Sequence, residues 1–88
     1  MARGFARFGD NVQTSKGMGV IIQGSSNTFI EGTPAARVGD VVLLPKGIGV
    51  IVQGSPTVFI NGRNAARLLD TTSPSGVIVT AASKTFTN

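Results

Sequence analysis

Short apolar segments alternate with polar, glycine-containing breaks along this chain, and the same pattern returns after about 30 residues. The segments "GVIIQ" and "GVIVQ", which begin at Gly19 and Gly49, are rich in β-branched residues and too short for a stable helix, so they predict strands. A polar break, a Phe-Ile pair and then Glu31-Gly32 or Asn61-Gly62 follow. Asn-Gly is a strong hairpin signal because both turn positions need a positive φ. The pattern predicts short hairpins and little helix.

The repeat covers most of the chain. Laying residues 6–40 on residues 36–70 makes about 20 of 35 positions identical, and a shorter third copy follows, in which Phe86 matches Phe59. We predict a single domain over residues 1–88, with repeats near 6–35, 36–65 and 66–88. Each unit is too small to bury its own apolar face, so the three should pack on one another. The predicted fold is an all-β body of three hairpin repeats with pseudo-threefold symmetry.

An Ala-Arg-x-x-Asp step marks the start of each repeat and uses three of the four acidic residues. We interpret it as a clamp between repeats, in which the carboxylate caps turn N–H groups and the guanidinium ties one copy to the next. A cation on the axis is disfavoured, because oxygen-only sites need about six ligands and an arginine competes for each carboxylate. The clamp residues are Arg7, Asp10, Arg37, Asp40, Arg67 and Asp70.

The composition excludes several classes of chemistry. The chain has no cysteine and no histidine, so it can form neither a disulfide framework nor an ordinary zinc site. It also lacks tyrosine, which leaves few groups for acid–base catalysis. Ser15 and Lys16 could form a nucleophilic pair, but adjacent residues on a strand point to opposite faces. We expect a protein that is not an enzyme, with no cofactor and no small-molecule substrate.

The net charge of +4 raises the alternative of a small basic nucleic-acid-binding β domain. The basic residues are scattered, however, and no aromatic cluster accompanies them to stack bases, so we expect no nucleic-acid partner. No apolar run approaches the roughly 20 residues that span a bilayer, and "MARGFARF" lacks the apolar core of a signal peptide. We expect synthesis in the cytoplasm.

The stretch "GTPAARVGD", with the "VFING" hairpin and the repeated Gly-Asp, resembles the proline-alanine-alanine-arginine (PAAR) repeat proteins. The resemblance implies a small β cone that caps the trimeric β-helical spike of a contractile injection machine, either a contractile phage tail or a type VI secretion system. One copy would bind one spike trimer, sharpen it for membrane piercing and contact the target-cell outer membrane transiently. Because the copies are alike, one chain could match three subunits.

The resemblance also implies a tip. Family members often close it with a metal held by three histidines and one cysteine from the segments that follow each repeat aspartate. In this chain those segments contain neither histidine nor cysteine, so we expect no metal site at the tip. We expect the tip to close instead as an apolar plug, with its lysines splayed into solvent by mutual repulsion. The tip loops contribute Lys16, Met18, Leu44, Pro45, Lys46, Ile48 and Pro74.

For the opposite, broad end we predict docking through the polar turns that follow the long strands. These partner-binding residues are Gln23, Gly24, Ser25, Asn27, Gln53, Gly54, Ser55 and Thr57. The matched phenylalanines Phe29, Phe59 and Phe86 are assigned to the hairpin core rather than to binding anchors, since a small domain needs its large apolar side chains inside. The glycines in "GMG" and "GIG" precede strands, so we read them as tight turns and not as a phosphate cradle.

Overall fold

The computed structural model describes residues 3–87, which form strands, turns and loops without any helix. Six antiparallel strands make one sheet in the order β10-β7-β6-β3-β2-β11. Its two end strands meet at an isolated bridge between Thr71 and Val77, so the sheet nearly closes on itself, and we call it the barrel. The barrel strands are β2 (Asn11–Thr14), β3 (Gly17–Ile21), β6 (Val41–Leu44), β7 (Gly47–Ile51), β10 (Thr72–Ser73) and β11 (Val77–Ile78).

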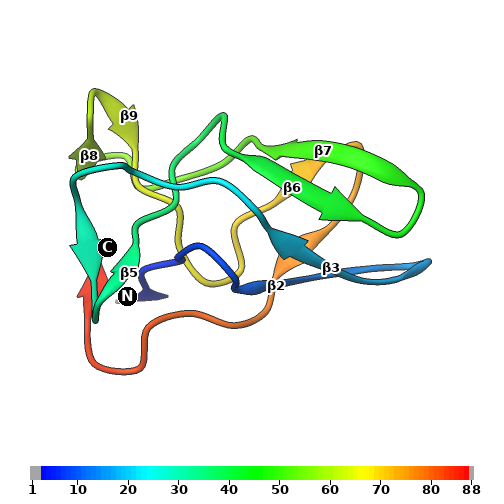
Figure 1. Cartoon of the computed structure of the whole chain (residues 1–88), viewed down its shortest axis with the longest axis horizontal. Helices are drawn as coiled ribbons and strands as arrows, with labels where there is room; N and C mark the ends of the chain where they lie inside the picture. The colour runs from blue at the N-terminus through cyan, green and yellow to red at the C-terminus, as the bar shows by residue number, and fades with distance from the viewer. Residues whose placement is uncertain (1–2, 88) are drawn as a thin grey trace.

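Three two-stranded hairpins, here called the base hairpins, lie at the end away from the turns of the β2–β3 and β6–β7 hairpins (Figure 1). They pair β4 (Phe29–Ile30) with β5 (Thr33–Pro34), β8 (Phe59–Ile60) with β9 (Arg63–Asn64), and β12 (Phe86–Thr87) with β1 (Arg3–Gly4). Each predicted repeat therefore supplies strands to the barrel and to the base. The predicted fold class, an all-β body of hairpin repeats, is confirmed.

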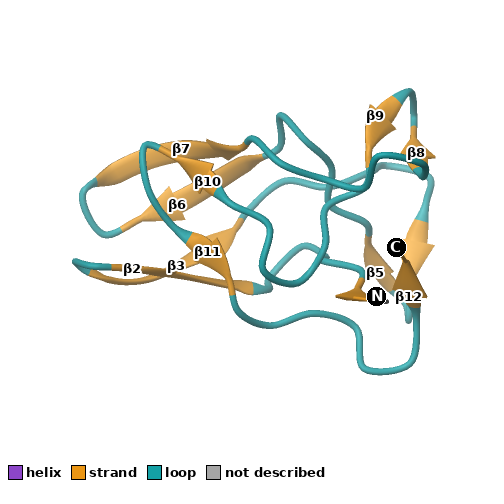
Figure 2. Ribbon diagram, turned by 180° about the vertical axis from the view of Figure 1, so that it is seen from behind, coloured by secondary structure: helices purple, strands orange, loops and turns teal. Residues whose placement is uncertain are grey.

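The third base hairpin is built from the two ends of the chain, which Figure 2 shows side by side. Arg3 pairs with Thr87 and Gly4 pairs with Phe86, in the register that Thr33–Pro34 keeps with β4. The amide N–H of Phe5 also donates to the carbonyl of Thr85 at 3.0 Å. The shorter third repeat is thus completed by residues that precede the first one, a contact that the repeat pattern alone does not predict.

A ring of backbone hydrogen bonds joins the three repeats. The amide N–H of Ala36 donates to the carbonyl of Ala6, that of Ala66 to Ala36, and that of Ala6 to Ala66, at 2.9 to 3.0 Å. All three alanines are fully buried. A larger side chain would hold the backbones apart, so the small Ala residues are what permit this contact. The ring is direct evidence for the predicted pseudo-threefold arrangement.

The apolar core has two parts along the axis. Matched residues such as Val12, Ile21 and Ala36 fill the barrel, and a second cluster that includes Ile30 and Ile60 lies among the base hairpins. Side chains alternate between the two faces of a strand, so burial of Ile30 directs its neighbour outward. The core assignment of the matched phenylalanines is accordingly wrong, since Phe29, Phe59 and Phe86 are 57%, 57% and 55% exposed.

The predicted hairpin turns are confirmed, and the glycine assignment needs a partial correction. Asn61 and Gly62 have φ values of 55° and 78°, as a two-residue hairpin turn with two positive φ angles requires. Gly19 and Gly49, in contrast, do not form turns. A Cβ atom at Gly49 would overlap the carbonyl oxygen of Ser73, so this glycine permits close packing of neighbouring hairpins.

Leu69 occupies a strained position that two glycines occupy in the other repeats. Its φ is 73°, against 88° for Gly9 and 93° for Gly39, and its side chain is 58% exposed. A left-handed conformation costs a non-glycine residue about 1 to 2 kcal/mol. We expect Leu69→Gly to stabilise the fold by about 0.5 to 1 kcal/mol, because the relief exceeds the entropy that glycine adds to the unfolded chain. Thermal unfolding should show a midpoint raised by several degrees.

Gly9→Ala provides the matched control for this prediction. No heavy atom lies within 4 Å of a Cβ built at Gly9, so the substitution tests backbone strain without a clash. It should lower stability by about 1 kcal/mol. A stabilising Gly9→Ala, or a destabilising Leu69→Gly, would contradict the strain argument.

Candidate functional site

Each repeated aspartate anchors a tight bracket with its own arginine. Asp40 is completely buried and accepts hydrogen bonds from the Arg37 backbone N–H at 2.8 Å, from Nε at 3.0 Å and from Nη2 at 2.9 Å. Asp10 and Asp70 accept the same three bonds from Arg7 and Arg67. The carboxylate therefore caps the turn and holds the guanidinium flat against it.

The second half of the clamp interpretation needs correction for Arg7 and Arg37, because the described partners of their side chains lie in their own repeats. Within residues 3–87, Arg7 bonds to Asp10 and Glu31, and Arg37 bonds to Asp40 and Asn61, all inside the same predicted repeat. An arginine and an aspartate three residues apart already satisfy each other across one turn. The Arg-Asp bonds fix the shape of a repeat, and contacts with further residues connect the repeats, among them the hydrogen bond from the Thr80 hydroxyl to Asp10 at 3.0 Å.

Gln23 and Gln53, predicted to bind a partner, are two of those connecting residues. The Gln23 side-chain oxygen accepts the backbone N–H of Val41 at 3.0 Å, and that of Gln53 accepts the N–H of Thr71 at 3.3 Å. Thr80 completes the set, since its hydroxyl accepts the N–H of Asn11 at 2.8 Å. Each side chain thus accepts a backbone N–H at or next to the first barrel strand of the following repeat, and the third repeat is followed by the first.

The serines of the predicted docking turns are internal as well. Ser25 and Ser55 are 1% and 0% exposed, so their side chains cannot meet a partner directly. The Ser25 hydroxyl donates to Asn61 at 2.7 Å, and Asn61 also bonds to Asn27 at 2.9 Å. Gly24 and Gly54 pack closely against the backbone of the base hairpins. The turns that contain these residues join the barrel to the base, while Asn27 and Thr57 are exposed.

Glu31 occupies the turn position that matches Asn61 and likewise links two repeats. Its carboxylate accepts the backbone N–H of Lys84 at 2.8 Å and the hydroxyl of Thr85 at 3.1 Å, and it pairs with Arg7 at 3.5 Å. The hydrogen bond from the Lys84 backbone, helped by Thr85 and Arg7, lowers the pKa of Glu31 below its ordinary value. The ionised form is therefore the one that stabilises the fold.

This lowered pKa predicts a loss of stability in acid. A carboxyl group whose pKa is lower in the folded state adds stability above its unfolded pKa and loses it as the pH falls through the folded value. We expect the midpoint temperature of unfolding to decrease once the pH is lowered below about 4. Glu31→Gln should show a smaller decrease between pH 7 and pH 3. Thermal unfolding at pH 7 and pH 3 checks this, and equal falls in the two proteins would contradict it.

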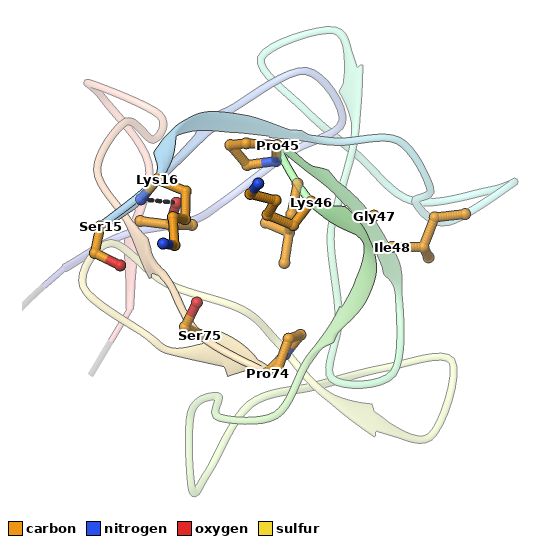
Figure 3. Close-up of a pocket in the computed structure, with 10 residues that line it drawn as sticks. Ser15, Lys16, Pro45, Lys46, Gly47, Ile48, Pro74 and Ser75 are labelled. Atoms are coloured by element: carbon orange, nitrogen blue, oxygen red, sulfur yellow. Dashed lines mark hydrogen bonds between the residues drawn. The ribbon is translucent and has the colours of Figure 1, made fainter.

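The tip is hollow, which corrects the predicted apolar plug. The turns at residues 14–17, 44–47 and 73–76, in the middle of the predicted tip loops, surround a cavity of about 240 Å³ (Figure 3). Leu44 is buried and lines the cavity, and Ile48 lines it as well, but Met18 and Ile48 are 54% and 68% exposed instead of filling the space. Pro45 and Pro74 stand at the rim. The strands that flank the third loop, β10 and β11, have two residues each, whereas the strands of the β2–β3 and β6–β7 hairpins have four or five.

The lysines of the tip also depart from expectation. Figure 3 shows Lys16 and Lys46 reaching over the same opening and not splayed away from it. Both line the cavity together with Ser15 and Ser75. Two ammonium groups of like charge face one concave space.

The tip residues do not fit the metal that the family resemblance implies. The polar groups that line the cavity are hydroxyls and ammoniums, and neither is a ligand that zinc or iron prefers in proteins. Among the described residues no three His, Cys, Asp or Glu side chains come together. The absence of a tip metal remains a prediction, which elemental analysis of untagged protein tests.

Comparison with known proteins agrees with the geometry. Residues 9–80 match the PAAR motif family, while a search of curated proteins gives no match. No helix among residues 3–87 is long and apolar enough to cross a membrane. The family is structural and forms spike tips, so its members associate with a spike protein. With three hairpin repeats around one axis and a family match over most of its length, this chain belongs to the PAAR motif family of injection-system spike tips.

Proposed function

We propose that a single copy of this protein caps a trimeric β-helical spike through its base hairpins and so sharpens the spike for membrane piercing. The observation that carries the proposal is the ring of equivalent contacts at Ala6, Ala36 and Ala66, by which one chain acquires three similar faces. A spike trimer presents three identical faces. One chain with pseudo-threefold symmetry can match them without forming a trimer of its own.

The base hairpins carry the side chains that such docking needs. Phe29, Phe59 and Phe86 are each more than half exposed, at matched positions of β4, β8 and β12. Large aromatic side chains contribute disproportionately to interface energies when a partner buries them. A trimeric β-helix ends in unpaired strand edges, which need a cover. Three exposed aromatic residues around one axis supply an apolar cover of the right symmetry.

The test is binding to the β-helical fragment of a trimeric spike. Light scattering on the purified complex should give one chain per trimer. Phe29→Asp and Phe59→Asp should each weaken binding by about tenfold or more, and the triple variant with Phe86→Asp should abolish it. Because these side chains are exposed, the variants should keep their thermal stability.

Ile48→Asp and Met18→Asp are the matched controls, since they alter exposed apolar side chains at the other end. They should leave spike binding unchanged. Loss of binding in these variants, with intact binding in the phenylalanine variants, would mean that the tip loops face the spike. Three chains per trimer would refute the symmetry argument.

A further inference from the structure

The tip cavity is a concave space without negative charge. Its lining includes Lys16, Lys46, Ser15 and Ser75 above an apolar floor that contains Leu44, and no acidic residue is among the lining residues. The four acidic residues of the chain are all paired with arginines, and none of them lines this cavity. The positive charge at the tip is therefore not compensated within the described residues, and a concave surface concentrates its field.

The polar groups of the cavity are available to a ligand. Neither Lys16 nor Lys46 forms an ion pair within residues 3–87. The hydroxyls of Ser15 and Ser75 likewise make no hydrogen bond there, whereas the Thr14 hydroxyl is occupied by Gly17 and Lys16. Two ammoniums and two hydroxyls thus face one opening as unused donors. Lysine is a common binder of phosphate, to which each ammonium offers up to three N–H bonds.

We propose that the tip cavity binds a phosphoryl group, held as a dianion between Lys16 and Lys46 with hydrogen bonds from Ser15 and Ser75. The volume of about 240 Å³ is below the roughly 300 to 1,000 Å³ of pockets that enclose drug-sized molecules. It accommodates a phosphoryl group and the first atoms of its ester. Two cations match the charge of a phosphate monoester better than that of a carboxylate.

Exposed apolar side chains at and beside the cavity favour a lipid as the source of this phosphoryl group. Met18, Leu43 and Ile48 are 54%, 47% and 68% exposed around the tip. Met18 and Leu43 line a shallow hollow beside Pro45. Basic residues next to exposed apolar side chains are typical of surfaces that enter the headgroup region of a bilayer. The inference rests on the tip alone and stands or falls separately from docking at the base.

The first experiment titrates the full chain with inorganic phosphate at constant ionic strength and follows backbone amide resonances. Saturable shifts are expected at residues 14–17, 44–47 and 73–76. Lys16→Gln with Lys46→Gln should weaken phosphate binding at least about tenfold. Lys84→Gln removes the same charge near Glu31, at the other end, and should change affinity by less than about twofold. The lysine variants should unfold at the same temperature as the parent chain, since both side chains are exposed.

The second experiment identifies the source of the phosphoryl group. Sedimentation is measured with phosphatidylcholine vesicles, with and without phosphatidic acid. Binding that needs phosphatidic acid and is lost in the double lysine variant assigns a lipid headgroup. Phosphate binding without vesicle binding supports the cavity and assigns a soluble phosphate ester. Shifts that do not saturate, or equal losses from Lys84→Gln and the tip variants, would overturn the proposal.

Discussion

Replacing Asp40 with alanine should destabilise the fold by about 3 to 5 kcal/mol. The carboxylate is completely buried, and its removal leaves the Arg37 guanidinium, itself only 9% exposed, without the partner that compensates its charge. The backbone N–H of Arg37 also loses its acceptor. A domain of 88 residues has roughly 4 to 13 kcal/mol of stability in total. The variant should therefore be partly unfolded at room temperature.

Urea unfolding at pH 7 measures this loss directly. Arg63→Ala is the control, because Arg63 reaches the same carboxylate at 3.1 Å from a side chain that is 41% exposed. Its removal should cost less than about 1 kcal/mol. The double variant of Arg37 and Asp40 should lose less than the sum of the two single losses, since each alone leaves a buried charge. Losses that simply add would show that the two residues are independent.

Removal of residues 1–5 should unfold the protein almost completely. Arg3 and Gly4 form the strand that pairs with β12, and Gly4 accepts the backbone N–H of Leu68 at 2.9 Å. Phe5 exchanges backbone hydrogen bonds with the loop at Thr85 and Ala82. Each buried group left without a partner costs about 1 to 3 kcal/mol, so several together approach the whole stability of the domain.

Circular dichroism and urea unfolding check this expectation. A circular permutant is the control, because it keeps the N-terminal residues and changes only the order of the chain. The permutant joins residue 88 to residue 1 by a short linker and opens the chain between Asn61 and Gly62, in the turn of a matched base hairpin. It keeps every contact of residues 3–5 and should retain most of the stability. If the shortened chain unfolds at the same midpoint urea concentration as the parent chain, the third base hairpin is dispensable for stability.

Several features could be predicted from the sequence because they depend on local signals that repeat. Asn61-Gly62 requires positive φ angles, and the β-branched segments after Gly19 and Gly49 suit strands whatever surrounds them. The repeat itself indicated three similar units. Such signals act within a few residues, and they recur in the two full repeats and in part in the shorter third repeat.

Other predictions failed because they depended on direction and distance between segments. Phe29 was expected inside from its size, but the alternation of β4 places Ile30 inside and Phe29 outside. Ser25 looked like a surface turn residue, yet the turn folds between the barrel and the base. Met18 and Ile48 were expected to fill the tip, but both side chains are more than half exposed and the tip contains a cavity.

The sequence by itself determined the fold class, the number of repeats, the hairpin turns and the membership in a family, since each follows from short-range patterns in the chain. Only the tertiary structure decided that residues 3–5 complete the third repeat, that the Arg-Asp brackets close within repeats, and that the base presents Phe29, Phe59 and Phe86. It also decided that Lys16 and Lys46 share one opening. These features depend on how distant segments meet, and a periodic pattern specifies what each repeat contains without specifying which of its faces the neighbouring repeat covers.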